Sequence, residues 1–105
     1  ALDYARFLQM IIDRGDIPGG RLLEESTIDT LLADHAPGLI DDNWHQGLAC
    51  AVTNEPANGG FWWGGYFNTQ YFGNSSTGEI AVLMKQTYGL RNDNTSLTFY
   101  EVMNR

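Results

Sequence analysis

The sequence predicts an α+β domain, in which an antiparallel meander of three to four strands follows two N-terminal helices and precedes one C-terminal helix. Two observations lead to this prediction. Apolar residues recur with the period of a helix in the first third of the chain, and short strand-like runs separated by Gly, Asn and Ser follow after about residue 38. The chain has 105 residues, 43% of them hydrophobic, which is enough for one small domain with a modest core.

The two N-terminal helices are predicted from apolar stripes. We expect the first to begin at Asp3 as its N-cap and to end with Gly15 as its C-terminal cap. The segment 15–20 then forms a tight connector. The second helix is expected over Glu24–Ala33, because its acidic first residues suit the positive end of the helix dipole. The stripes consist of Tyr4, Phe7, Leu8, Ile11 and Ile12 in the first helix and Ile28, Leu31 and Leu32 in the second.

The strands are predicted after the helices. Gly47–Thr53 is expected to be a buried strand, followed by a loop over 54–60. Phe61–Phe72 is expected to be extended, with a hairpin connection over 73–78. Glu79–Thr87 carries apolar residues on both faces, which is typical of a central strand covered by helices on each side.

The last helix is predicted over about 95–104. We expect Leu97, Tyr100 and Val102 or Met103 to face inward. The run Asn92-Asp93-Asn94 before it is expected to be its cap rather than a calcium loop, since the later glycine and glutamate of such a loop are missing.

Charge excludes several functions. The chain has 13 acidic and 6 basic residues and a net charge of −7. Its basic residues are scattered, so neither nucleic acid nor an anionic membrane surface is an expected partner. No apolar run approaches the roughly 20 residues of a membrane span. The single cysteine, Cys50, lies in an apolar run and is expected to be a buried hydrophobe rather than a nucleophile.

We expect no metal site. His35, Asp41, Asp42 and His45 are residue types that bind metals, but their spacing matches no specific site, and Asp42 and His45 fall in a loop without a pattern. No cofactor is expected either.

The strongest chemical signal is the aromatic segment 61–72, which holds seven of the 13 aromatic residues. Core packing of a hairpin explains part of it. Gly64 and Gly65 weaken the strand, however, and glycines inside a strand often mark a place where another group approaches the backbone. Aromatic rings beside bare backbone are suited to binding a ligand.

The segment from Asp3 to about Gln86 resembles the C-terminal end of the serine β-lactamase-related family, which includes class C β-lactamases, penicillin-binding-protein-like peptidases and related esterases. Several pieces match in order: the helix Asp3–Gly15, the run Arg21-Leu22-Leu23 before an acidic helix start, the strand opening at Gly47-Leu48-Ala49, the triplet Trp63-Gly64-Gly65, and the strand Ile80–Met84. Glu24-Glu25 stands where the family often has Ser-Pro-Glu, which alters only the helix cap.

The resemblance implies half of an active site. Catalysis in this family rests on a Ser-x-x-Lys box, a Tyr-x-Asn or Ser-x-Asn box, and a third box such as Lys-Thr-Gly on the edge strand of the sheet. Trp63-Gly64-Gly65 corresponds to the third box, and the backbone N–H of Tyr66 to one oxyanion-hole donor. Trp63 carries no charge for a substrate carboxylate, so esterase- or peptidase-like acyl transfer is expected rather than β-lactam hydrolysis. The expected substrate-binding residues are Trp63, Gly64, Gly65, Tyr66 and Asn68.

The nucleophile is missing. None of the four serines, Ser26, Ser75, Ser76 and Ser96, is followed three places later by lysine. Tyr66-Phe67-Asn68 spells Tyr-x-Asn, but it directly follows the third box instead of preceding it, which we interpret as coincidence. The chain is therefore expected to be a partial domain, 1–105, inactive by itself. By resemblance, its partner is the N-terminal part of the same hydrolase, and its compartment is periplasmic or extracellular.

Two other functions are compatible with the sequence. One is a small sugar- or ligand-binding module built on the clustered aromatics. The other is a structural domain that associates through a bare sheet edge.

Overall fold

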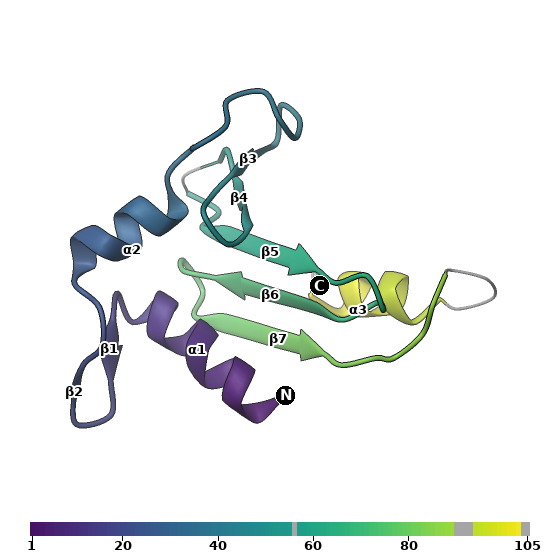
Figure 1. Ribbon diagram of the computed structural model, residues 1–105, viewed down its shortest axis with the longest axis horizontal. Helices are drawn as coiled ribbons and strands as arrows, with labels where there is room; N and C mark the ends of the chain where they lie inside the picture. The colour runs from purple at the N-terminus through teal and green to yellow at the C-terminus, as the bar shows by residue number, and fades with distance from the viewer. Residues whose placement is uncertain (56, 90–93, 104–105) are drawn as a thin grey trace.

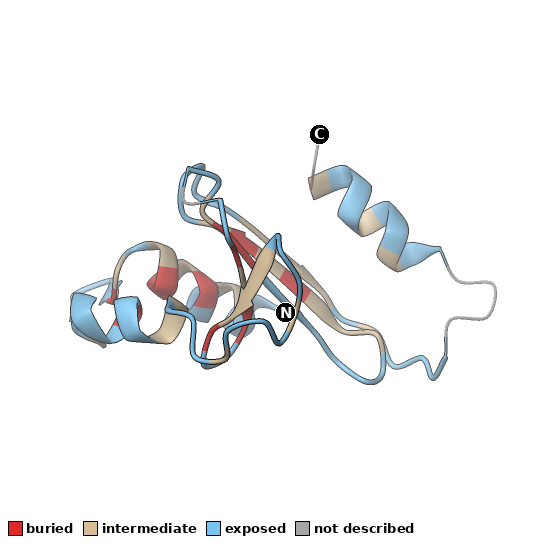
Figure 2. Ribbon diagram, turned by 90° about the horizontal axis from the view of Figure 1, so that it is seen from above, coloured by how far each residue is buried: buried red, intermediate tan, exposed pale blue. Residues whose placement is uncertain are grey.

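The computed structural model describes residues 1–55, 57–89 and 94–103, and it confirms the α+β class. The three predicted helices are present as α1 (Leu2–Ile12), α2 (Glu25–Leu32) and α3 (Thr95–Met103). They accompany a five-stranded antiparallel sheet, with α1 and α3 on opposite faces of it (Figures 1 and 2). Residues 56, 92, 93 and 104, which the sequence assigned to a loop, a cap and a helix end, lie outside the described residues.

The sheet is a meander, as predicted, with one strand more than expected. Its strands pair in chain order, and each pair is antiparallel. The pleat places residues 61, 63, 71, 80 and 82 on the face toward α1, because they are cross-strand partners or lie two positions apart. The five strands are β3 (Trp44–Gln46), β4 (Ala51–Thr53), β5 (Gly60–Gly64), β6 (Gln70–Asn74) and β7 (Glu79–Leu83).

The caps of α1 differ from the prediction. Its N-cap is Ala1, and Asp3 lies in the first turn, paired with Arg6 at 3.1 Å. At the other end, the N–H of Arg14 donates to Ile11 and the N–H of Gly15 donates to Met10, which is a Schellman motif with Arg14 (φ 58°) in the left-handed position. The left-handed cap is therefore Arg14, one residue before the expected Gly15.

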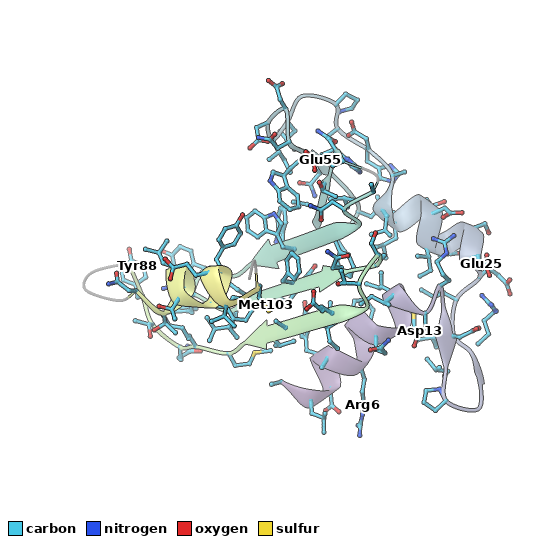
Figure 3. The ribbon with its side chains drawn as sticks, turned by 180° about the vertical axis from the view of Figure 1, so that it is seen from behind. Arg6, Asp13, Glu25, Glu55, Tyr88 and Met103 are labelled. Atoms are coloured by element: carbon cyan, nitrogen blue, oxygen red, sulfur yellow. The ribbon has the colours of Figure 1, made fainter. Side chains whose placement is uncertain are left out.

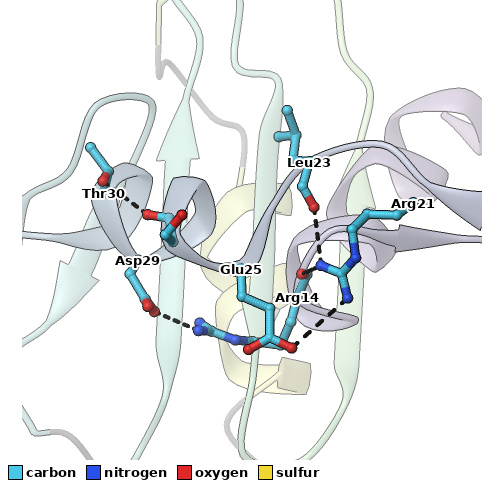
Figure 4. Close-up of polar contacts among 7 residues, drawn as sticks. Arg14, Arg21, Leu23, Glu25, Asp29 and Thr30 are labelled. Atoms are coloured by element: carbon cyan, nitrogen blue, oxygen red, sulfur yellow. Dashed lines mark hydrogen bonds and ion pairs between the residues drawn. The ribbon is translucent and has the colours of Figure 1, made fainter.

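The expected tight connector after α1 is a small hairpin of two strands, β1 (Asp16–Ile17) and β2 (Gly20–Arg21). Arg21 joins this hairpin to its surroundings. Its guanidinium pairs with Asp16 at 2.9 Å and donates to the carbonyl oxygens of Arg14 and Leu23. Arg14 in turn pairs with Asp29 on α2 (Figure 4). The ion pairs thus fix the two helices at one end of the molecule.

Three strand predictions were wrong. Gly47–Thr53 is a strand only from Ala51, and the preceding strand β3 was missed, so that His45 lies in a strand and not in a loop. The segment 61–72 is not continuous, because a turn separates β5 from β6. The connection expected over 73–78 is shorter, since β6 continues to Asn74.

The predicted central strand is an edge strand. Within the described residues, β7 pairs only with β6, and its other side has no strand partner. It ends at Leu83 instead of Thr87. One of its two apolar faces is explained by packing against α1. A bare edge of this kind can pair with another strand.

The core lies where α1, α2 and the sheet meet (Figure 2). The expected inward residues of α3 are mostly exposed: Leu97 is 65% and Tyr100 59% accessible, and Val102 is also exposed. Of the four, only Met103 is half-buried, and it lies beside the sheet (Figure 3). The fully packed residues are Leu8, Met10, Ile11, Ile28, Cys50, Ala51, Phe61 and Tyr71.

The chain exposes more surface than a compact monomer of its size. Its accessible area is 6971 Å², about 1,100 Å² more than the roughly 5,900 Å² expected for a folded monomer of this mass. The excess includes large apolar side chains on both faces of the sheet, among them Leu2 and Phe7 on α1 and Trp62 on β5. This excess is larger than the roughly 800 Å² that each partner buries in a standard protein interface.

Candidate active-site strand

The triplet Trp63-Gly64-Gly65 lies at the end of β5 and the start of the β5–β6 turn. β5 is the third of five strands, so the expectation of an edge strand is wrong for the strand as a whole. Near its C-terminal end, however, β5 lacks a strand partner on one side. The pairing with β4 consists of Ala51 with Trp62 and Val52 with Phe61, and it stops there. Beyond Trp62, β5 has a strand partner only on the side of β6.

The direction of the backbone groups identifies what this local edge offers. The N–H of Gly65 donates to the carbonyl oxygen of Thr69 at 2.7 Å, on the β6 side. In an antiparallel ladder the backbone groups of successive residues point to alternate sides. Gly64 therefore presents its N–H and C=O to the side without a strand, whereas Tyr66 lies in the turn that follows β5. Among the described residues, no acceptor binds the N–H of Tyr66.

The turn holds Tyr66 in place. The N–H of Asn68 donates to the carbonyl oxygen of Gly65 at 3.0 Å, which closes a four-residue turn. Asn68 is left-handed (φ 66°), whereas Tyr66 and Phe67 have negative φ, so the turn is type I with Tyr66 as its second residue. A left-handed residue after a type I turn is the usual three-residue hairpin connection.

Asn68 anchors the fold. Its side-chain amide donates to the carbonyl oxygens of Thr87 (2.6 Å) and Gly89 (3.1 Å), which ties the segment after β7 to the turn. Both amide hydrogens are therefore used within the chain. Asn68 was predicted among the substrate-binding residues, but its amide nitrogen donates to Thr87 and Gly89, and Asn68 does not line the hollow described next.

A hollow of about 360 Å³ borders the triplet. Trp63, Gly64 and Gly65 line it, so three of the five predicted substrate-binding residues come together there. Sequence reasoning missed the other contributors, which come from α1, β6 and β7. Because Tyr71 is the cross-strand partner of Trp63 and Val82 is that of Tyr71, a correct pairing register is the signal that could have found them. The remaining lining residues are Tyr4, Thr69, Gln70, Tyr71, Val82 and Met84.

The two glycines differ in what requires them. A Cβ atom on Gly65 would lie 2.1 Å from the hydroxyl oxygen of Thr69, so the packing of the turn explains this glycine. A Cβ atom on Gly64 would have no neighbour closer than 3.9 Å. Internal packing therefore does not require a glycine at position 64, and the space there is open to another molecule.

Trp62 and Trp63 serve different faces. They are similarly exposed, at 39% and 42%, but the pleat directs them to opposite sides of the sheet. Trp62 makes an edge-to-face contact with Trp44, with ring centroids 6.1 Å apart. These two indoles line a second hollow of about 210 Å³ beneath α3, together with the carboxamides of Asn58, Gln70 and Asn74.

The tyrosine of the Tyr-x-Asn sequence is not prepared for proton transfer. A hydrogen bond with Tyr88 raises the pKa of the Tyr66 phenol. A general base needs the opposite shift, toward neutral pH. Tyr88 lies at the end of the molecule far from Glu25 (Figure 3).

Cys50 is buried, as predicted, and burial raises the pKa of its thiol to about 11. The thiol is therefore protonated at neutral pH, whereas a nucleophilic cysteine must be a thiolate.

The histidines are engaged by the protein. The ring of His45 contacts Asn54 Oδ1 at 2.7 Å and the carbonyl oxygen of Leu32 at 2.8 Å, and Nε2 of His35 contacts the carbonyl oxygen of Thr30. The described residues contain no group of three or more His, Cys, Asp or Glu that could hold a metal ion.

Comparison with known proteins gives no assignment: no family model matches the chain, and no curated protein matches it significantly. None of the helices in the described part of the chain has the length and apolar character needed to cross a membrane.

Proposed function

We propose that residues 1–105 form the C-terminal part of a serine acyl hydrolase of the β-lactamase-related type. In this proposal they supply the substrate-binding strand and one oxyanion donor, and the nucleophile lies outside these residues. The observation that supports it most is the local free edge of β5, where Gly64 faces no strand beside an open hollow and the N–H of Tyr66, in the following turn, has no acceptor among the described residues. The sequence resemblance independently assigns the oxyanion donor to the same N–H.

The chemistry follows from the backbone. A substrate carbonyl placed against Tyr66 accepts a hydrogen bond from its N–H, and this bond strengthens as attack by serine places negative charge on the oxygen. The second donor is the N–H of the serine itself, by resemblance. The acyl-enzyme formed in this way is then hydrolysed by water.

The exposed apolar surface supports the proposal that another part of the hydrolase packs against residues 1–105. The bare edge of β7 and the accessible apolar residues of α1 lie next to one another, and Leu2 and Ala81 line the same shallow hollow. We assign the N-terminal part of the same hydrolase domain to this surface, because it must bring the nucleophile to β5. The alternative occupant is a second copy of the chain, paired through β7.

The charge around the strand favours neutral substrates. Among the described residues that line the hollow, none is charged. Arg14 and Arg21 are ion-paired with Asp29 and Glu25 of α2 (Figure 4) and do not line the hollow. The lining itself therefore provides no cation for a substrate carboxylate.

We therefore expect the complete natural gene product containing residues 1–105 to hydrolyse short acyl esters faster than a cephalosporin. The measurement is kcat/KM for p-nitrophenyl acetate and butyrate against a chromogenic cephalosporin. Inhibition of ester hydrolysis by a fluorophosphonate confirms a serine nucleophile. Faster turnover of the cephalosporin contradicts the neutral-substrate assignment, and the absence of all hydrolysis contradicts the proposed function.

The second hollow favours one alternative, a small sugar-binding module. Indole faces beside carboxamide groups can stack on a sugar ring and bind its hydroxyls. Such a module would show saturable quenching of tryptophan fluorescence by a saccharide together with no ester hydrolysis.

A further inference from the structure

We infer that the hollow beside Trp63 is an acyl-chain pocket, so that the preferred substrates are esters of apolar, medium-length acids. This inference rests on the proposed function and names the substrate class of the same site. It is carried by the chemistry of the lining, by its exposure, and by its continuity with the free edge of β5.

The lining is apolar where the acyl chain would lie. Tyr4, Trp63, Val82 and Met84 present rings or aliphatic groups from three separate elements and the residue just after β7. Tyr71 adds the carbon face of its ring, since its hydroxyl donates to the carbonyl oxygen of Ala49 at 2.8 Å. The polar side chains are the neutral Thr69 and Gln70.

The pocket walls are incompletely covered by the chain itself. Tyr4, Trp63 and Met84 are large apolar side chains with 42%, 42% and 47% of their surface accessible. Isolated exposed apolar residues need no explanation, but here three of them converge on one hollow. Its volume of about 360 Å³ is within the range of small-molecule sites.

The pocket continues into the free edge. Gly64 and Gly65 line it and also form the backbone that leads to Tyr66. Tyr66 itself does not line the pocket but follows Gly65 directly, so we place the acyl chain of a substrate bound to its N–H along Gly65 and Gly64 to Trp63, with Met84 and Val82 farther along the wall. The uncharged lining would oppose an acyl group that carries a carboxylate or an ammonium.

The expected effect is a dependence on chain length. Each methylene that moves from water into an apolar pocket raises kcat/KM by about fourfold until the pocket is full. The test uses the complete natural gene product and p-nitrophenyl esters from acetate to decanoate. Hexanoate has four methylenes more than acetate, so we expect kcat/KM to rise by about 100- to 300-fold between them and then to level off.

Substitutions test whether the pocket residues cause the dependence of kcat/KM on chain length. Met84→Glu should abolish the rise with chain length, whereas Met84→Leu should keep it. Leu97→Ala is the matched control, because Leu97 is an exposed apolar side chain of α3, which lies on the opposite face of the sheet, and it does not line the pocket. It should leave both acetate hydrolysis and the rise unchanged.

The p-nitrophenyl ester series measured with the wild-type protein is the first test of the inference. Hydrolysis of acetate with no gain for longer esters overturns the acyl pocket and leaves the proposed function standing. A rise that persists in Met84→Glu places the acyl chain elsewhere and also overturns it. Absence of hydrolysis for every ester is a failure of the proposed function.

Discussion

Replacing Tyr66 with proline should lower kcat/KM for ester hydrolysis by about 100- to 1,000-fold, the usual effect of losing one oxyanion donor. Proline removes the N–H, and with it the exposed phenol and its contacts with Phe67 and Tyr88, but it keeps the backbone of the turn. Tyr66 is the second residue of a type I turn, where proline is favoured, and its N–H has no acceptor among the described residues. The unfolding free energy should therefore stay within about 1 kcal/mol of wild type.

The control for this variant is Tyr66→Ala. Both substitutions remove the phenol and its contact with Tyr88, but alanine keeps the N–H. We expect Tyr66→Ala to retain activity within a few fold. Equal losses in the two variants would show that the ring matters and not the N–H, and full activity in Tyr66→Pro would remove Tyr66 from the oxyanion site.

Replacing Gly73 with alanine should destabilise the protein by about 2–3 kcal/mol, a typical cost of overpacking a core. Gly73 is buried in β6, and a Cβ atom there would lie 2.2 Å from Cζ of Phe61. The Phe61 ring is 1% exposed and cannot move aside freely. The measurement is urea unfolding of the complete natural gene product.

Gly64→Ala is the matched control for stability, because its Cβ would meet nothing closer than 3.9 Å. We expect it to change the unfolding free energy by less than about 1 kcal/mol. In the Gly73→Ala background, Phe61→Leu should recover part of the loss, since the two residues are in contact. Equal stabilities of Gly73→Ala and Gly64→Ala would contradict the packing described here.

Local patterns were sufficient to predict the fold class and the helices. The stripe containing Leu8 and Ile11 and the stripe containing Ile28 define α1 and α2, and both lie in the core. The apolar stripe of α3 led to a wrong prediction of burial, because Leu97 and Tyr100 repeat with helical spacing but the described chain covers little of their surface. Periodicity identifies an apolar face and does not identify what packs on it.

The strand boundaries depended on interactions that a linear pattern does not record. In the turn of the aromatic segment the left-handed residue is Asn68 and not a glycine. The sequence pattern therefore predicted a continuous strand. β3 is too short for alternation to be recognised. Whether β7 is central or at an edge depends on the strands beside it and not on its own residues.

The candidate site was predicted only in part. The residues Trp63, Gly64 and Gly65 were identified from composition and resemblance, and they line one hollow. The pocket residues Tyr4 and Met84 come from distant parts of the chain, so only the three-dimensional packing brings them together. The side of Gly64 without a strand follows from where β4 begins, at Ala51, which the sequence did not indicate.

The central proposal is that the strand around Trp63 serves a serine nucleophile that residues 1–105 do not contain. Fluorophosphonate labelling of the complete natural gene product, followed by proteolysis and mass spectrometry of the labelled peptide, tests this most directly. We predict one labelled serine, outside residues 1–105 and followed three places later by lysine. Labelling of Ser26, Ser75, Ser76 or Ser96, or no labelling under conditions that modify a known serine hydrolase, would contradict the proposal.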